Sequence, residues 1–276
     1  MRPALKLFIP KDASFMKIDC HVHSRERSAC GVDGDEDMVR AAIGYGLDGL
    51  VFTDHGKYIS HKRVEELNKK FNPFCVFRGI EVNTREKEEF VVLGFYEPAL
   101  EKSDWKYQDL HTLVRERRGF ISLAHPFRYR KDLKFDITAY PPDAIECSFS
   151  VSSRDRAKEQ LKITGAHPIV ASDGHCVAHV GRYYINLHGA PKNEAELAAF
   201  LKKGDYDLCG DPVRLEVQNA GIREEERVIR EMLAEGRDRK YYERVVKKGA
   251  GFLFDTLQRG DSFLKPIFPG AKERRD

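Results

Sequence analysis

Six short apolar runs in this chain end in side chains that can bind metal ions, and this pattern constrains the fold more than any other feature. The runs occupy residues 18–23, 50–55, 76–81, 121–125, 144–147 and 169–175. Apolar runs of this length, bounded by polar residues, are typical of buried parallel strands. The ends of such strands converge at one mouth of an α/β barrel. The pattern therefore predicts a metal site at the mouth of a barrel.

Helical spacing of apolar residues fills the intervals between these runs. One helix is expected over residues 35–45, with Asp35 as its N-cap and Gly46 beyond its end. Further helices are expected around residues 64–71, 110–114, 157–161 and 197–201, and further strands at residues 90–95 and 183–187. This alternation predicts a parallel, barrel-like α/β fold. About seven strand–helix units fit before residue 205, fewer than in a full eightfold barrel.

The pattern changes to helices alone from Ile222 onward. We therefore expect an N-terminal extension over residues 1–15, a barrel domain over residues 16–205, and a helical C-terminal extension over residues 206–276 that packs on the barrel. Basic residues lie between the apolar stripes of this extension, and we expect them to form a solvated helical face. A contact with nucleic acid or with a partner is the alternative interpretation of the same residues.

Composition argues against the membrane and disulfide-rich classes. The chain has 276 residues, 41% of them hydrophobic, which is enough for a core of barrel size. No apolar stretch is long enough to span a bilayer, and the start of the chain lacks the apolar core of a signal peptide. The six cysteines form no Cys-x-x-Cys pair, which predicts reduced thiols and a cytoplasmic location. A net charge of +3 permits an anionic substrate without requiring one.

The runs carry more candidate ligands than one metal ion needs. His21 and His23 stand two residues apart, so they lie on the same side of a strand. A carboxylate at Glu81 can bridge two cations, which an imidazole cannot do. The candidate metal ligands are His21, His23, His55, Glu81, His125, Cys147, Asp173 and His175. This mixture of imidazoles, carboxylates and a thiol predicts a cluster of two or three divalent ions, with Zn, Mn or Fe as candidates.

The order of the motifs resembles one known family. The chain reads His-x-His, Thr-Asp-His, Gly-x-Glu, Ala-His-Pro and Ser-Asp-x-His over roughly residues 16–190. This succession is similar to that of the polymerase and histidinol phosphatase (PHP) superfamily of metal-dependent phosphoesterases. The resemblance implies a distorted (β/α)7 barrel of the TIM type with a dinuclear or trinuclear metal site, which agrees with the number of units found above.

The resemblance also implies a division of the ligands among the ions. The implied ligands of the first ion are His21, His23, Glu81 and Asp173; those of the second are Glu81, His125 and Cys147; those of the third are His55 and His175. Relatives often place one more ligand of the third ion where this chain has Ser28. Cys30 and Asp33 could replace it only after a shift of the loop, so neither is predicted as a ligand.

The predicted activity is that of a metal-dependent phosphoric ester hydrolase. The substrate is expected to be a phosphorylated small molecule, such as histidinol phosphate, a nucleotide or a sugar phosphate, attacked by a hydroxide that bridges the metals. Arg128 and Arg182 are the candidates for binding the phosphate. Asp54 and Asp19 neighbour ligand histidines and are expected to orient them.

Two alternatives remain open at this stage. A nuclease or a phosphotyrosine-protein phosphatase could use the same metal site. A nuclease should carry a basic groove with stacking aromatic residues, and residues 127–131 supply only part of one. A non-catalytic, metal-stabilised interaction module is the alternative from another class, and the serine at position 28 is the feature that favours it.

Overall fold

The six ligand-bearing runs form strands of one sheet or the segments that directly follow them. In the computed structural model, which describes residues 15–102, 104–246 and 251–270, the sheet has the strand order β7-β6-β5-β4-β3-β2-β1-β8-β9. The strands that carry or precede the candidate ligands are β1 (Met16–Val22), β2 (Gly49–Phe52), β3 (Cys75–Asn83), β5 (Phe120–Leu123), β6 (Ala144–Glu146) and β7 (His167–Ile169). Most of their apolar side chains are buried, as expected for strands covered on both faces.

Three strands depart from the predicted parallel arrangement. β4 (Glu89–Leu93) runs antiparallel between β3 and β5, and β8 (Tyr183–Leu187) runs antiparallel to β1. β9 (Tyr206–Gly210) pairs antiparallel with β8, in a segment that was expected to be helical. The connection from β3 to β4 spans only residues 84–88, whereas a parallel crossover needs roughly a dozen residues. The predicted parallel direction is therefore wrong for β4 and β8, and residues 206–210 form a strand where a helix was expected.

Backbone contacts almost close the sheet into a barrel. Val22 at the end of β1 forms an isolated parallel bridge with Gly174, which follows β7 in the chain. The N–H of His23 donates to the carbonyl of Gly174 at 2.8 Å, and the N–H of Gly174 donates to the carbonyl of His21 at 3.1 Å. The predicted distorted barrel is confirmed, with β1 to β7 as its wall. Its closure brings the loop after β7 against the end of β1.

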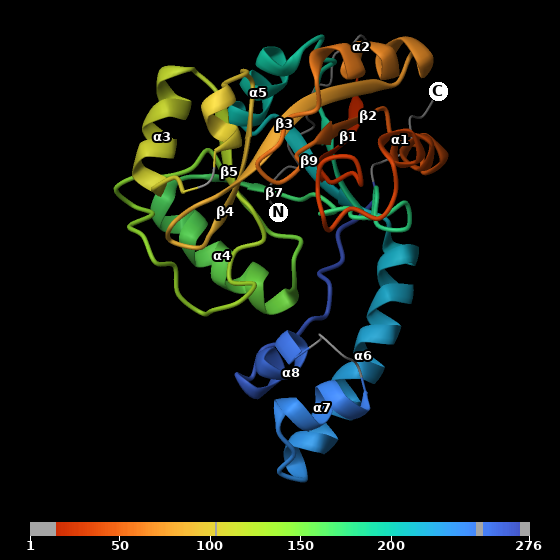
Figure 1. Cartoon of the computed structure of the whole chain (residues 1–276), viewed down its shortest axis with the longest axis vertical. Helices are drawn as coiled ribbons and strands as arrows, with labels where there is room; N and C mark the ends of the chain where they lie inside the picture. The colour runs from red at the N-terminus through yellow and green to blue at the C-terminus, as the bar shows by residue number, and fades with distance from the viewer. Residues whose placement is uncertain (1–14, 103, 247–250, 271–276) are drawn as a thin grey trace, which may run out of the picture.

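Helices cover the outside of this barrel (Figure 1). They are α1 (Asp35–Gly44), α2 (His61–Lys70), α3 (Tyr107–Glu116), α4 (Val151–Thr164) and α5 (Glu194–Lys203), with a short 3-10 helix η1 (Pro98–Glu101). Ser60, Ser150 and Asn193 cap α2, α4 and α5 by accepting backbone hydrogen bonds. At α1 the N-cap is Gly34 rather than the predicted Asp35, which is already helical.

The C-terminal extension leaves the barrel and returns to it. α6 (Pro212–Ala234) projects away from the sheet, and α7 (Arg239–Val245) and α8 (Gly251–Gln258) lie beside its far end (Figure 1). Ile229, Tyr242, Phe254 and Leu257 form a small hydrophobic core of their own there. The chain then returns over residues 259–270 to the barrel, where Val151 N donates to Leu264 O at 2.8 Å.

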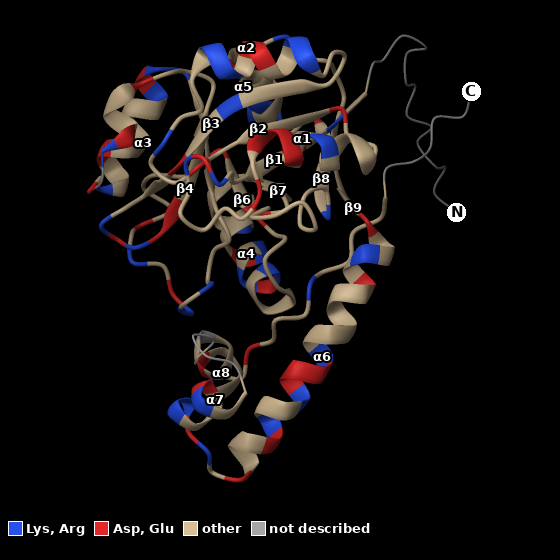
Figure 2. Cartoon of the chain, turned by 45° about the vertical axis from the view of Figure 1, so that its right-hand side comes forward, with Lys and Arg blue, Asp and Glu red and all other residues tan. Residues whose placement is uncertain are grey.

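Charges of both signs alternate along the extension. Figure 2 shows acidic and basic residues interspersed along α6. Arg227, for example, pairs with Glu224 and with Glu231, each at 2.6 Å. A mixed surface of this kind fits the expected solvated face better than a nucleic-acid contact, which calls for a basic stripe.

Several sequence predictions concern regions or properties outside the barrel. The predicted N-terminal extension lies outside the described residues, apart from Phe15. Among the described helices, none is both long and apolar enough to cross a bilayer. All six cysteines lie in the described part of the chain, and all are free thiols.

Candidate metal centre

Two histidines and two carboxylates meet where the end of β1 faces β3 and the loop after β7. His21 Nε2 lies 3.3 Å from Glu81 Oε2 and 3.5 Å from Asp173 Oδ1. His23 Nε2 lies 3.3 Å from each of the same two oxygens. Two ligand atoms bound to one zinc ion at about 2.1 Å, with a tetrahedral angle between them, are about 3.4 Å apart. The spacing of these atoms therefore fits a single shared ion.

A second group adjoins both oxygens of Glu81. His125 Nε2 lies 2.9 Å from Glu81 Oε1 and 3.4 Å from Glu89 Oε2. His55 Nδ1 lies 3.0 Å from Glu81 Oε2 and 3.8 Å from Glu89 Oε1. Glu81 thus stands between the two groups, as expected for a bridging carboxylate.

Glu89 was not predicted from the sequence. It is the first residue of β4, whereas the sequence pattern pointed to side chains at the last residues of strands. Because β4 is antiparallel to β3 and β5, its first residue lies at the same mouth as their last residues. The sequence does show a glutamate directly before the apolar run 90–95. It can be recognised as a candidate ligand only once the direction of the strand is known.

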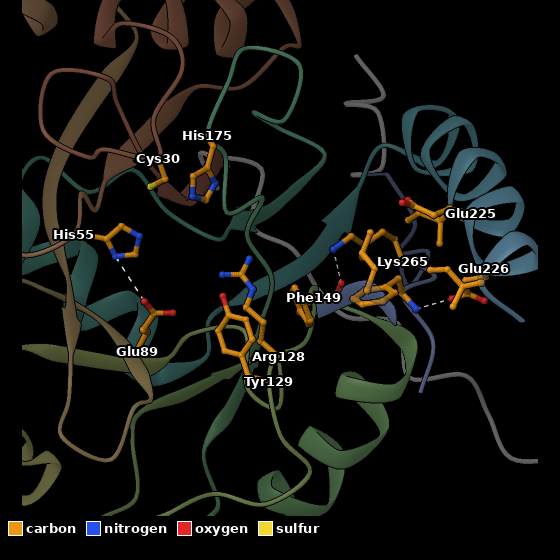
Figure 3. A pocket seen from close by; sticks show the side chains of 14 residues that line it. Cys30, His55, Glu89, Arg128, Tyr129, Phe149, His175, Glu225, Glu226 and Lys265 are labelled. Atoms are coloured by element: carbon orange, nitrogen blue, oxygen red, sulfur yellow. Dashed lines mark hydrogen bonds and ion pairs between the residues drawn. The ribbon is translucent and has the colours of Figure 1, made fainter. Parts of the chain in front are cut away.

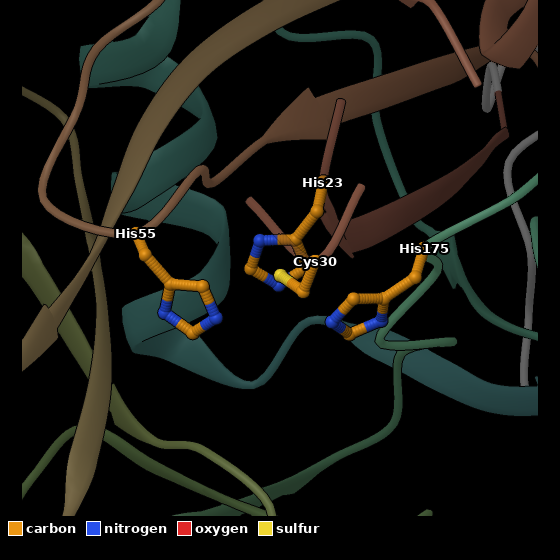
Figure 4. A group of neighbouring side chains, drawn as sticks. All are labelled: His23, Cys30, His55 and His175. Atoms are coloured by element: carbon orange, nitrogen blue, oxygen red, sulfur yellow. The ribbon is translucent and has the colours of Figure 1, made fainter. Parts of the chain in front are cut away.

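A third group contains three imidazoles and a thiol. Donor atoms of His23, Cys30, His55 and His175 all lie within 4.8 Å of one another (Figure 4). The ring of His23 stacks on those of His55 and His175, with centroids 4.6 and 4.5 Å apart. Cys30 was not predicted as a ligand, yet the loop conformation that the sequence left open places its sulfur here.

Ser28 serves the loop rather than this third group. Its hydroxyl donates to Asp54 Oδ1 at 2.8 Å, accepts from the backbone N–H of His55 at 3.1 Å, and lies 3.3 Å from His23 Nδ1. Ser28 therefore ties together the segments that carry His23 and His55. Cys30 supplies the sulfur of the third group.

Cys147 is not brought into any of the three groups. Its sulfur lies in the main hydrophobic core and donates to the carbonyl of Ile145 at 3.5 Å. Burial, together with the charge of Glu146, raises the pKa of the Cys147 thiol to about 12. Neighbouring residues of a strand point to opposite faces, so Glu146 faces the site instead. Its Oε2 accepts from His125 N at 2.6 Å, and its Oε1 lies 3.6 Å from His21 Nδ1.

The donor set fits divalent cations. Five buried polar atoms at this mouth have no hydrogen-bond partner among the described residues: Glu81 Oε2, Asp173 Oδ1, His21 Nδ1, His55 Nδ1 and Glu146 Oε1. Buried polar atoms are rarely left without a partner. Buried carboxylate oxygens without a donor are best explained by a positive charge beside them.

Electrostatics at the site favour ionised carboxylates, and neutral rings at two of the histidines. Burial alone would raise the pKa of Glu81 and of Asp173, but the charges of His21 and His125 near Glu81, and of Arg128 and His21 near Asp173, hold both pKa values well below their usual range. The two carboxylates in turn raise the pKa of His21 and of His125 against the effect of burial. Burial lowers the pKa of His55 and of His175, which keeps these rings neutral. Ionised carboxylates and neutral imidazoles are the ligand forms of these side chains.

Two of the candidate ligands have strained backbone conformations. His125 has a φ of 24° and Asp173 a φ of 49°, both in the left-handed region that residues other than glycine rarely adopt. Such strain persists only where the surrounding structure enforces it, and it is concentrated at functional sites. Here it places His125 beside Glu81, and Asp173 beside His21 and His23.

The two aspartates that were expected to orient histidines act on loops instead. Asp54 is fully buried and accepts from Ser24 N at 2.7 Å and from Arg27 Nε at 2.7 Å, in addition to Ser28. Asp19 accepts from Ser172 N at 3.0 Å and from Gly181 N at 2.9 Å. Each carboxylate thus fixes a loop that carries ligand side chains.

Arg128 and Arg182 both border the site. Arg128 Nη2 donates to Asp173 Oδ2 at 2.7 Å, and its guanidinium carbon lies 4.8 Å from the centre of the Phe149 ring. Arg182 lines a cavity of about 150 Å³ next to the candidate ligands. Its buried Nε has no hydrogen-bond partner among the residues that the structure describes. Lys265, from the returning C-terminal segment, lines the same cavity and was not predicted.

A larger cavity of about 630 Å³ opens beside the ligands (Figure 3). His55, Glu89, Arg128 and His175 are part of its lining on the barrel side. The opposite side is formed by the C-terminal extension through Ile222, Glu225, Glu226, Ile229, Leu253, Phe263 and Lys265. The volume lies within the range typical of small-molecule sites.

Comparison with known families supports this description. The model of the PHP domain family matches residues 19–219. No curated protein sequence matches the chain.

Solved structures with the same fold are distant in sequence. A two-domain protein from Bacteroides vulgatus, described as containing a PHP-like metal-dependent phosphoesterase, is 16% identical with a TM-score of 0.53, over 74% of this chain and 69% of that chain. A lesion-specific endonuclease from Pyrococcus furiosus is 16% identical with a TM-score of 0.52, over 71% of this chain and 58% of that one. An amidohydrolase from Chromobacterium violaceum is 15% identical with a TM-score of 0.52, over 69% of this chain and 97% of that one. At such identities the likeness extends to the fold alone.

Proposed function

Because this chain belongs to the PHP domain family, we propose that it is a metal-dependent phosphoesterase that acts on a phosphorylated small molecule. One observation carries the proposal: imidazoles and ionised carboxylates converge beside a half-buried arginine that lines a cavity of about 630 Å³. Divalent ions held by these ligands would activate water and neutralise charge on the phosphoryl oxygens.

We assign the ligands from the geometry of the three groups. The proposed first set is His21, His23, Glu81 and Asp173; the second is Glu81, Glu89 and His125; the third is Cys30, His55 and His175. In the second set, Glu89 takes the place predicted for Cys147. In the third set, Cys30 is the additional ligand, whereas relatives often have it at the position of Ser28. Glu146 is proposed to orient His21 and the backbone of His125 from behind.

Arg128 is the proposed phosphate-binding residue. Asp173 fixes one end of its guanidinium, and the face of Phe149 supports it from below. The remaining N–H groups are free to donate to two oxygens of a phosphoryl group, which the planar guanidinium matches in geometry. Arg182 lies farther along the adjoining cavity and is the second candidate for the same role.

A hydrolysis assay with and without metal tests the proposal. A chelator is expected to abolish hydrolysis of phosphomonoesters, and Zn, Mn or Fe is expected to restore it. Glu81→Gln should lower kcat/KM about 100-fold or more because the variant loses a bridging charge. Glu65→Gln, on the exposed face of α2, is the matched control and should retain full activity. Full activity of the Glu81 variant, or of the chelated enzyme, would refute the proposal.

The nuclease alternative is tested in the same assay. The likeness to an endonuclease concerns the fold, so single-stranded DNA is included as a substrate. The extension that walls the cavity favours a small substrate, and we expect turnover of phosphomonoesters without cleavage of DNA. Turnover of any of these substrates also argues against a non-catalytic module.

A further inference from the structure

The cavity beside the ligands has two chemically different sides. The barrel contributes charged and metal-binding groups such as Arg128 and Glu89. The extension contributes the apolar side chains of Ile222, Ile229 and Leu253. A phosphate group alone fills only a small part of about 630 Å³, so the apolar side is available to the rest of the substrate.

The acidic side chains on the extension hold this side of the cavity together. Glu225 accepts from the hydroxyl of Tyr242 at 2.8 Å, which joins α6 to α7. Glu226 accepts from Ser262 Oγ and from Phe263 N, each at 2.7 Å. Because both carboxylates already have partners in the extension, the apolar character of the wall dominates what it offers a ligand.

A short strap, residues 261–266, fixes Lys265 between the extension and the barrel. Asn219 on α6 accepts from Lys265 N at 2.7 Å and donates to Lys265 O at 3.0 Å. On the barrel side, Ser262 N donates to Ser152 Oγ at 3.0 Å. The backbone of Lys265 is thus held from both sides, independently of its side chain.

The side chains of Lys265 and Arg128 both contact the ring of Phe149, and Lys265 Nζ also donates to the carbonyl oxygen of Phe149. Lys265 Nζ is 4.7 Å, and the Arg128 guanidinium carbon 4.8 Å, from the centre of the same Phe149 ring (Figure 3). Burial, together with the charge of Arg128, lowers the pKa of Lys265 to about 8. Both cations line the smaller cavity of about 150 Å³ next to the candidate ligands, where an anion can contact them.

We propose that the C-terminal extension completes the substrate site and selects phosphomonoesters of apolar alcohols. Lys265 and Arg128 bind the phosphoryl group, and Ile222, together with Ile229, Leu253 and Phe263, takes up the apolar part of the alcohol. This inference rests on the proposed function, since it names the substrate class of the same site.

Two esters of primary alcohols provide the test, since their leaving groups have similar reactivity. 2-Phenylethyl phosphate presents an apolar ring, and glycerol 3-phosphate presents only hydroxyls. Wild-type enzyme is expected to show kcat/KM at least about tenfold higher for the first, the gain expected for burying a ring on an apolar wall. Ile222→Asp should remove most of this preference by lowering kcat/KM for 2-phenylethyl phosphate.

Two further variants separate the wall from the phosphate contact. Lys265→Met should lower kcat/KM about tenfold or more for both esters, because the phosphoryl group is common to them. Val217→Asp, at a position of α6 that is 71% exposed and outside the cavity, is the control and should change neither value. Ile222→Ala is a milder change at the same position. A melting curve for each variant shows whether loss of folding, rather than loss of the apolar contact, causes a lower activity.

The outcomes distinguish the two proposals. Hydrolysis of both esters at equal efficiency, unaltered by the Ile222 variants, overturns the inference and leaves the phosphoesterase proposal standing. Failure of metal-loaded enzyme to hydrolyse any phosphomonoester overturns both.

Discussion

At the residue scale, two cysteines show that the direction of a side chain decides whether it can be a metal ligand. The apolar run 144–147 offers Glu146 and Cys147 side by side, and the strand of three residues is too short for its alternation to be read from sequence. The structure turns Glu146 to the site and Cys147 to the core. Cys30 lies in a loop, where no periodicity indicates the direction of a side chain, and its sulfur joins His55 and His175.

Cobalt substitution tests the proposed role of Cys30. A thiolate bound to Co²⁺ gives an intense charge-transfer absorption that imidazole and carboxylate ligands do not give, and thiolates favour such ions. We expect this band in cobalt-loaded wild-type protein, its loss in Cys30→Ser, and its retention in Cys147→Ala. The reverse result would assign the thiolate ligand to Cys147, as the sequence motif implied.

At the scale of elements, the prediction succeeded where local pattern decides and failed where pairing decides. The strands β1, β2, β3, β5 and β6 were recognised because burial on both faces requires a nearly continuous run of apolar residues. β4 follows β3 after a connection too short for a parallel crossover, and the direction of β8 depends on its pairing with β1, which is distant in sequence. β9 is only partly buried, so no continuous apolar run marks it. This error in direction also concealed Glu89.

An ion pair that joins two helices carries a prediction about stability. Asp35 at the start of α1 is buried and accepts from Arg63 of α2 through Nη2 at 2.7 Å and Nε at 3.1 Å. Asp35→Asn should lower the free energy of unfolding by about 1–3 kcal/mol at pH 7, measured by urea denaturation. Asp37→Asn, exposed in the same turn, is the control and should cost less than about 0.5 kcal/mol.

The same pair sets a pH dependence. Burial opposes the charge of Asp35, but hydrogen bonds and charges from Arg63 outweigh it and lower the pKa of Asp35 below its ordinary value of 3.8. The stabilisation is therefore complete above this ordinary value and disappears as the pH falls through the lowered one. The difference in stability between wild type and Asp35→Asn should shrink in that acid range; a constant difference would contradict the assignment.

At the scale of the whole molecule, the proposed ligands come from segments spread across the barrel. β1, β3 and β4 and the loops after β2, β5 and β7 each contribute one or more of them. Ions that bind only the folded chain would therefore stabilise the entire barrel rather than one loop.

Removal of metal should lower the melting temperature. With free ion about a hundredfold above its Kd, binding contributes about 2.7 kcal/mol, or about 5–10 °C for a domain of this size. Calorimetry with and without chelator measures the shift, and Glu81→Gln should show a smaller one. An unchanged melting temperature in wild-type protein would argue against the proposed metal centre.

The two sides of the cavity belong to separate hydrophobic cores, one in the barrel and one in the helices beyond it. Substitutions that reshape the outer wall therefore leave the packing of the barrel, and with it the ligand geometry, unchanged. Related proteins with this arrangement can therefore evolve a different substrate preference while they keep the same catalytic chemistry.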